Sequence, residues 1–263
     1  MILIKQAGAA LGRVVVLLLL PFAALAGDEI NDVRLHSLYF NDAAMVQRTV
    51  AEAGFGFYDH DGAVKSVSSL ELRALGPIAE HLELGGEVSM REYKYAKQTK
   101  DHDTQEGGIS DIRLVGRYHQ PLTRRFTHLT FGVELTLPTG DEDLDQGKIN
   151  VGGFTAVRGD LDPGLVGLAS VGLHLVDIDD NHQISLHSGA GLIYTLKEKI
   201  HLSGEFLFKT EEEYAVITTA ADFKLADSHL GVSNSGRLRT ALSFGVADGA
   251  PDVALYVGYG HTF

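Results

Sequence analysis

A pair of histidines beside an acidic segment is the arrangement in this sequence that comes nearest to a metal site. His174 and His187 flank residues 177–182, DIDDNH, and in a hairpin they would be cross-strand neighbours below that segment. Imidazole and carboxylate groups together hold zinc or a similar ion. A plain polar cross-strand pair has the same pattern, and we favour it. The sequence therefore predicts no metal and no cofactor, with His174 and His187 as the candidates to examine.

Nucleophilic catalysis by a serine would need a base within hydrogen-bond reach of the hydroxyl. Ser188 lies in a segment where apolar and polar residues alternate as in a strand. We expect no histidine at the same height on an adjacent strand. Its neighbour His187 points to the opposite face, because successive residues of a strand alternate. We therefore predict no catalytic residue and no enzyme activity.

Arginine and glutamate residues also recur at alternate positions of extended segments. On one face of a sheet they would either line a narrow polar path or pair across it and block it. The ten residues of this set are Glu71, Arg73, Glu87, Arg91, Arg113, Arg117, Glu134, Glu205, Arg237 and Arg239.

Composition excludes several classes of protein. The 263-residue chain has a formal net charge of −13, whereas nucleic-acid affinity depends largely on lysine and arginine, so we expect no nucleic-acid partner. Without cysteine the chain forms neither a disulfide framework nor a cysteine-based zinc site.

The N-terminus indicates export. Lys5 and Arg13 precede an apolar run over 14–22, and small residues follow up to Ala26. This pattern is typical of a secretory signal peptide, and the run is too short for a retained spanning helix of about 20 residues. We predict that residues 1–26 are removed, which takes the charge from −13 to −15 because two cations are lost.

Alternation of apolar and polar residues dominates the chain after residue 50. A soluble sandwich hides such apolar faces, whereas an outer-membrane barrel turns them to lipid and keeps the polar faces inside. Several segments reach the roughly 9–11 residues that cross a bilayer, above the roughly 5–6 of ordinary strands. We predict an all-β, transmembrane antiparallel barrel of about 12 strands over residues 51–263. The strands are expected at 51–58, 63–75, 81–95, 109–118, 128–138, 148–157, 164–176, 183–196, 200–208, 214–224, 237–247 and 252–263.

Connections between these strands alternate in length, as in bacterial barrels with short periplasmic turns and longer outer loops. The acidic segments 96–108, 139–147 and 177–182 are expected outside the cell. The connection 226–236 is too long for a periplasmic turn and is the weakest point of the strand count.

The chain ends on a strand, ALYVGYGHTF, with an apolar face that includes Tyr259 and Phe263. Because lipid leaves an open sheet edge unsatisfied, this last strand must pair with the first. A terminal phenylalanine after alternating apolar residues resembles the assembly signal of bacterial outer-membrane barrels, here Tyr259 and Phe263. We therefore expect the barrel assembly machinery, outer-membrane lipid and lipopolysaccharide as partners.

Residues 131–157, FGVELTLPTGDEDLDQGKINVGGFTAV, resemble a segment of the outer-membrane proteins of the phenol meta-degradation pathway family. In that family a strand ends in Leu-Pro-Thr-Gly-Asp, an acidic loop follows, and a glycine-rich strand leads back. The resemblance covers about half of the chain, mostly residues 105–263. It implies an outer-membrane transporter of aromatic or other hydrophobic small molecules, and it assigns no catalytic residue.

The segment 27–50 has no clear strand pattern and is a candidate plug for the interior. A barrel of about 12 strands is intermediate between a filled interior and an open channel. We therefore predict a narrow or gated passage in the bacterial outer membrane for a small-molecule substrate. Two alternatives remain: a lipid-modifying barrel enzyme of the phospholipase or lipid A deacylase type, and a structural or adhesive barrel.

Overall fold

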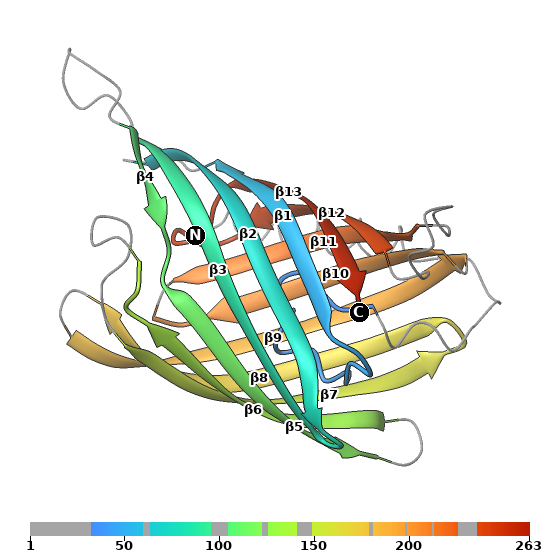
Figure 1. Cartoon of the computed structure of the whole chain (residues 1–263). Coiled ribbons are helices and arrows are strands. Elements are labelled where there is room, and N and C mark those ends of the chain that lie inside the picture. The colour runs from blue at the N-terminus through green and yellow to red at the C-terminus, as the bar shows by residue number, and fades with distance from the viewer. Residues whose placement is uncertain are drawn as a thin grey trace, which may run out of the picture.

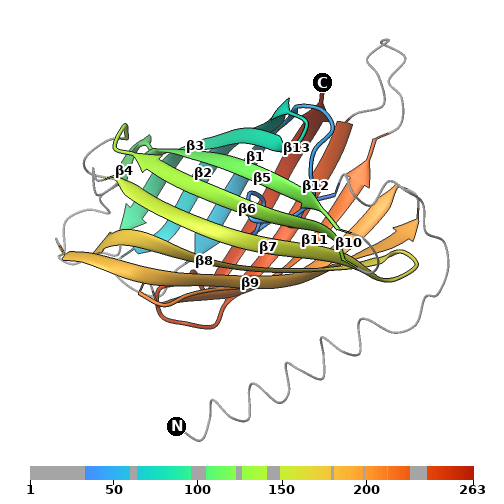
Figure 2. The same cartoon turned by 90° about the horizontal axis from the view of Figure 1, so that it is seen from below.

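The computed structural model describes residues 33–59, 64–95, 105–122, 126–140, 149–178, 181–197, 199–211, 213–225 and 236–263. The predicted signal peptide and most of the acidic connections lie outside these residues. The described residues form one antiparallel sheet that curls into a barrel (Figures 1 and 2). Its strands are β1 (Val50–Asp59), β2 (Val64–Ala79), β3 (Leu82–Tyr95), β4 (Gln105–Ile109), β5 (Ile112–Pro121), β6 (Phe126–Leu137), β7 (Asn150–Asp162), β8 (Leu165–Ile178), β9 (Asn181–Lys197), β10 (Ile200–Lys209), β11 (Tyr214–Lys224), β12 (Gly236–Gly245) and β13 (Val253–Thr262).

Closure joins the first and last strands, as predicted. β1 pairs with β13 along its whole length, from Val50 opposite Thr262 to Asp59 opposite Val253. Each further strand pairs with its neighbour in the sequence, except around β4. β11 and β12 pair directly, so the long connection between them leaves the strand order unchanged. The prediction of a closed all-β barrel is therefore confirmed.

The prediction of one strand over 109–118 is wrong in one respect. The strand is interrupted at residues 110–111, with β4 before the interruption and β5 after it. Both pieces pair with β3, β4 alongside Met90–Lys94 and β5 alongside Leu82–Glu87, so they share one position in the ring. Between them, the Ser110 hydroxyl accepts a hydrogen bond from the Ser89 backbone N–H at 3.0 Å. A side chain that replaces a ladder partner in this way interrupts a regular strand. The ring thus has twelve positions and one extra strand.

The two faces of the barrel differ as the period of two requires. Large apolar side chains stand exposed on the outer face, among them Leu84, Val133 and Val257, each more than half exposed. Such a continuous apolar belt suits contact with lipid hydrocarbon. Within the residues that the structure describes, no helix is long and apolar enough to cross a membrane.

Residues 33–49 lie inside the barrel, where the blue trace before β1 runs within the ring of strands (Figures 1 and 2). Leu35 and Leu38 pack on Val166, Leu168 and Ile193 of the β8–β9 wall. Tyr39, Phe40, Ala43 and Val46 pack on Leu75, Val115, Phe154 and Ala156. We refer to residues 33–49 as the internal segment.

Small residues on the inner face make room for aromatic rings. The Tyr256 ring lies over Gly54 and Gly258, where added Cβ atoms would overlap it, and its hydroxyl donates to Glu52 Oε1 at 2.8 Å. Aromatic rings that cover neighbouring glycines in this way help to fix strand register.

Gly54→Ala should therefore destabilise the barrel, by about 1–3 kcal/mol, because the new methyl group displaces the Tyr256 ring from a packed position. The measurement is the urea midpoint of unfolding in detergent. Gly204→Ala is the matched control, since nothing lies within 4 Å of its added Cβ. Equal midpoints for the two variants would contradict this account of the seam between β1 and β13.

Candidate functional site

The internal segment divides the space inside the barrel. At the end of the barrel where Phe263 lies, which we call the C-terminal end, a cavity of about 290 Å³ is lined by Tyr39 together with β11, β12 and β13. Towards the opposite end two cavities of about 490 and 470 Å³ adjoin, and Tyr39 also lines the second of them. The internal segment therefore separates polar spaces at the two ends.

Asp42 is the central anchor of the internal segment. Its carboxylate is fully buried and accepts hydrogen bonds from Arg158 Nη1 at 2.9 and 3.1 Å. It also accepts the backbone N–H of Leu35 at 3.2 Å and that of Ala44 at 2.9 Å. Burial acts to raise the pKa of Asp42, but Arg158 and Arg34 outweigh it and hold the pKa below its ordinary value.

Glu83 of β3 binds the end of the internal segment to one wall. It contacts Arg117 at 2.9 Å and His119 at 2.6 Å, and it accepts the backbone N–H of Val46. Thr130 donates from the same wall to the Ala43 carbonyl at 2.9 Å. Glu83 and Thr130 thus join three strands of the wall, β3, β5 and β6, to the segment.

Glu205 of β10 binds the start of the internal segment to another wall. Its two carboxylate oxygens accept the backbone N–H groups of His36 and Ser37, each at 2.7 Å. The Ser37 hydroxyl also donates to Thr218 at 2.8 Å. Because Glu83 and Glu205 stand on different walls, the segment is held across the interior.

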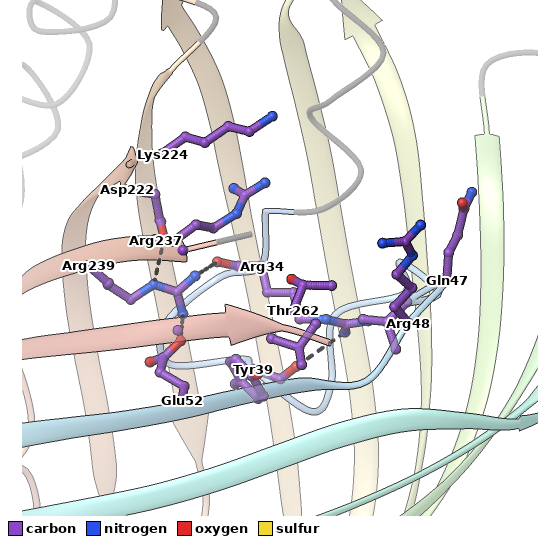
Figure 3. Close-up of a pocket in the computed structure, with 14 residues that line it drawn as sticks. Arg34, Tyr39, Gln47, Arg48, Glu52, Asp222, Lys224, Arg237, Arg239 and Thr262 are labelled. Carbon is purple, nitrogen blue, oxygen red and sulfur yellow. Dashed lines mark hydrogen bonds and ion pairs between the residues drawn. The ribbon is translucent and has the colours of Figure 1, made fainter. Parts of the chain in front are cut away.

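A charged cluster surrounds Tyr39 near the middle of the barrel (Figure 3). The Arg73 guanidinium lies 4.2 Å from the centre of the Tyr39 ring, and Arg73 Nε contacts Glu52 at 3.2 Å. Arg239 contacts Asp222 at 3.0 Å and donates to the Arg34 carbonyl at 2.8 Å. Cations over an aromatic ring attract it, so the cluster also holds Tyr39 in place.

The ten predicted charged residues all belong to the interior. Eight line the cavities towards the opposite end or the cavity at the C-terminal end, and one of these, Arg73, also belongs to the charged cluster. Arg117 donates to the Ala44 carbonyl of the internal segment, and Glu205 binds the same segment. The cavity-lining residues are Glu71, Arg73, Glu87, Arg91 and Arg113, Glu134, and Arg237 and Arg239.

Sequence reasoning placed Glu205 and Arg117 in the interior but missed the other charged residues that hold the internal segment. Glu83 was visible as a charge at an inward position of an expected strand, whereas Arg158 lies one residue beyond the expected strand 148–157. Alternation alone does not show which partner either residue meets. Arg34 and Asp42 lie in a segment without a strand pattern, so nothing in the sequence marked them.

The two candidate metal ligands, His174 and His187, are neighbours on β8 and β9. His187 lies opposite Gly172, diagonal to His174, and the two rings stack with their centres 3.8 Å apart. His174 Nδ1 lies 3.8 Å from Glu134. Across the described ranges no group of three or more histidine, aspartate or glutamate side chains is arranged to hold an ion.

Tyr259 and Phe263, the residues of the predicted assembly signal, point outward and are 46% and 70% exposed. The Tyr259 hydroxyl contacts His261 Nδ1 at 3.2 Å. The backbone N–H of Phe263 donates to the Thr49 carbonyl at 2.9 Å, so the last residue extends the seam by one hydrogen bond.

His36 should make the docking of the internal segment inside the barrel depend on pH. Its ring packs on Tyr256, and burial first, then Arg73 and Arg239, lowers the pKa of His36 well below 6.5. A released His36 regains its ordinary pKa, so docking is strongest above pH 6.5 and weakens as the pH falls below it.

We expect the fraction of barrels with a released internal segment to rise between pH 7.5 and 5.5, by up to about ten-fold from this one group, measured as the current that the protein carries in a planar bilayer. The low pKa of Asp42 keeps that anchor charged over the whole interval. His36→Asn is the control and should abolish the pH response of this origin. An unchanged response in the variant would rule out His36 as its source.

Comparisons with known proteins agree on the fold. No family model matches the chain, and no curated protein matches it. The KdgM porin aligns over 81% of this chain and 99% of its own, with 11% identity and a TM-score of 0.57. The COG4313 outer membrane channel from Pseudomonas putida F1 aligns over 84% and 97%, with 15% identity and a TM-score of 0.59. The NanC porin aligns over 82% and 100%, with 8% identity and a TM-score of 0.54.

The fold is therefore that of the outer-membrane β-barrel channels. The narrower resemblance to the phenol meta-degradation pathway family is not confirmed by these comparisons and stays a prediction.

Proposed function

We propose that this protein is a gated channel of the bacterial outer membrane for small molecules, exported by a cleaved signal peptide and closed by the internal segment. One observation carries the proposal: a chain segment inside a closed barrel is anchored to different walls and separates polar cavities at the two ends. Release of the segment would join these cavities into one path. The channel structures that share the fold support the same role.

The polar contacts that hold the internal segment suit a segment that has to leave and dock again. The internal segment is held by Asp42, Glu83 and Glu205, whose partners are cations and backbone N–H groups. When the segment leaves, water enters and hydrates both members of each pair, so the desolvation cost of the buried charges is recovered. A segment held through apolar contacts alone would lose more on exposure to water.

We also propose that the protein is a channel rather than an enzyme, on the evidence of its outer face. Ser188 lies opposite Val171 on β8 and Phe208 on β10, neither of which is a base. A serine nucleophile requires a base within hydrogen-bond reach. The register therefore supports the absence of a serine hydrolase centre at this position.

The test is electrical. The full chain and a variant that lacks residues 27–48 are each refolded and placed in planar bilayers. We expect the full chain to show rare openings and the shortened variant to show stable stepwise currents, because the variant keeps β1 and the Thr49 carbonyl that receives Phe263.

A variant that lacks only residues 27–32 is the matched control, since it keeps every described anchor. It should behave as the full chain does. The proposal fails if the full chain already carries stable currents equal to those of the shortened variant, or if a correctly folded shortened barrel carries none.

A further inference from the structure

Glu205, which holds the start of the internal segment, differs from the other two carboxylates that hold it. Asp42 pairs with Arg158, and Glu83 pairs with Arg117. Glu205 is 4% exposed, and no cation of the described residues forms an ion pair with it. Buried charges are usually paired with an opposite charge. Within the part of the chain that the structure describes, Glu205 is therefore a buried anion that lacks a cationic partner.

The internal segment meets this anion with three donors from two adjacent residues. The backbone N–H groups of His36 and Ser37 donate to the two different oxygens of Glu205, each at 2.7 Å. The Ser37 hydroxyl donates to Thr218 Oγ1 at 2.8 Å. One N–H donor on each oxygen of a carboxylate is the contact that a guanidinium or amidinium group makes. The segment therefore supplies the donors of such a group without its positive charge.

The wall around Glu205 offers further polar contacts to such a group. Thr218 of β11 stands directly opposite Glu205, and Ser243 of β12 stands directly opposite Thr218. The Thr218 and Ser243 hydroxyls contact each other at 2.7 Å, and the Ser203 hydroxyl donates to Glu205 Oε1 at 3.1 Å. The wall thus presents two carboxylate oxygens for two N–H groups and a neighbouring hydroxyl oxygen for a third.

A cavity adjoins the contact between Glu205 and the internal segment. His36 and Ser37 line the cavity of about 470 Å³, and Tyr39 and Phe40 add ring surface to the same lining. Ligand cavities usually measure about 300–1,000 Å³. A molecule with a planar charged head and a small apolar body therefore has space beside the donors that it would replace.

The charges around this cavity do not repel a cation. Four cations line it, and two of them, Arg73 and Arg113, pair with carboxylates outside the lining. The other two cations are matched in number by two carboxylates of the lining, so the formal charge of the set is zero. The four carboxylates are Glu52, Glu134, Glu71 and Glu87.

We propose that Glu205 and Thr218 form a binding site for a small molecule with a guanidinium or amidinium group, and that the backbone of His36 and Ser37 occupies this site while the internal segment is docked. The head of the molecule donates to both oxygens of Glu205 and to Thr218, and it brings the positive charge that the segment lacks. Such a molecule competes with the start of the segment. That its binding opens a channel rests on the proposed function.

Calorimetric titration of the refolded full chain at pH 7.5 in uncharged detergent tests the site. The probes are benzamidine, benzylamine and benzamide, which share one ring. Benzylamine keeps the positive charge without the forked N–H groups, and benzamide keeps a planar head without the charge. We expect benzamidine to bind more tightly than either by about ten-fold or more, because charge-assisted bidentate contacts are the strong ones.

Glu205→Gln should lower the affinity for benzamidine by about ten-fold or more, because the amide keeps the shape but loses the charge and one acceptor oxygen. Glu71→Gln is the matched control, since it removes a carboxylate from the lining of the same cavity. It should keep the affinity. Heat-modifiable migration on a gel checks that both variants are folded, and the comparison of the three probes on the unchanged chain needs no variant.

Three results would each overturn the inference. The first is a full chain that does not bind benzamidine, and the second is benzylamine or benzamide that binds as tightly. The third is a folded Glu205→Gln variant that loses no more affinity than Glu71→Gln does.

Failure of this site is distinguishable from failure of the proposed function. Currents of the full chain and of the variant that lacks residues 27–48 are compared without any probe. If the two differ as expected but benzamidine does not bind, the site alone is refuted. If benzamidine binds through Glu205 but the shortened barrel never conducts, the proposed function alone is refuted. Where both hold, benzamidine should raise the current of the full chain.

Discussion

Asp42→Ala should release the internal segment and open the barrel. The substitution leaves the Arg158 guanidinium fully buried without its carboxylate and removes the acceptor of two backbone N–H groups. Breaking a buried ion pair from one side costs about 3–5 kcal/mol. This cost destabilises only the docked state, because water hydrates Arg158 once the segment has left. The docking equilibrium should therefore shift by between about a hundred-fold and several thousand-fold.

A single introduced thiol reports this shift. The chain has no cysteine, and Leu38 in the internal segment is 2% exposed, so Leu38→Cys gives one protected reporter. At a fixed pH, a water-soluble thiol reagent should modify the Leu38→Cys variant slowly. It should modify the Leu38→Cys/Asp42→Ala double variant far faster. Planar-bilayer currents of the same proteins should rise in parallel.

Two further variants separate charge from packing. Asp42→Asn keeps an oxygen that accepts backbone N–H groups but loses the charge that faces Arg158, so its effect should be intermediate. Glu80→Ala removes a carboxylate that is almost fully exposed and should change nothing. If Asp42→Ala leaves both the modification rate and the currents unchanged, Asp42 does not hold the segment.

The sequence predicted the barrel well because the evidence for it is local. A period of two assigns each residue to a face, and the inward charges such as Arg73 and Glu134 followed from that period alone. Closure followed from the physics of an edge in lipid and was confirmed by the β1–β13 pairing. The interruption at Ser110 escaped, because it depends on a hydroxyl that meets Ser89 on another strand.

The position and the contacts of the internal segment could not be derived in the same way. Asp42 and Arg158 are 116 residues apart, and no periodic pattern connects a segment without strand character to a strand. Arg158 lies one residue beyond the expected strand 148–157, and alternation does not show which residue it meets. The same limit applies to His174 and His187, which were expected as cross-strand neighbours, whereas their stacked contact with a diagonal register required the structure.

The predicted signal peptide lies outside the described residues and stays a prediction, and so do the assembly partners. The position of the internal segment nevertheless changes how the charged interior is understood. Charges that could have lined an open path instead bind a piece of the same chain, through Glu83 and Glu205 on different walls. In the proposed channel this arrangement is the closed state, and opening requires water to replace the polar contacts of the internal segment.

Deletion of Phe263 should prevent insertion into the outer membrane in cells. The residue makes one seam hydrogen bond, to the Thr49 carbonyl, and its side chain is 70% exposed on the outer face. One peripheral hydrogen bond contributes only about 0.5–1.5 kcal/mol. The folded barrel should therefore tolerate the deletion, whereas recognition of the terminal phenylalanine by the assembly machinery should not. Insertion is measured by heat-modifiable migration of the membrane fraction on a gel, and stability by refolding the same variant in detergent.

Matched variants isolate the role of the terminus. Phe206→Ala removes another outward aromatic side chain, 43% exposed, from β10 and should insert normally. Phe263→Leu keeps the backbone and an apolar side chain and should insert in part. Failure in cells together with normal refolding in detergent would assign Phe263 to recognition, and failure in both would assign it to the stability of the seam. Normal insertion of the deletion variant would show that the last residue is not an assembly signal.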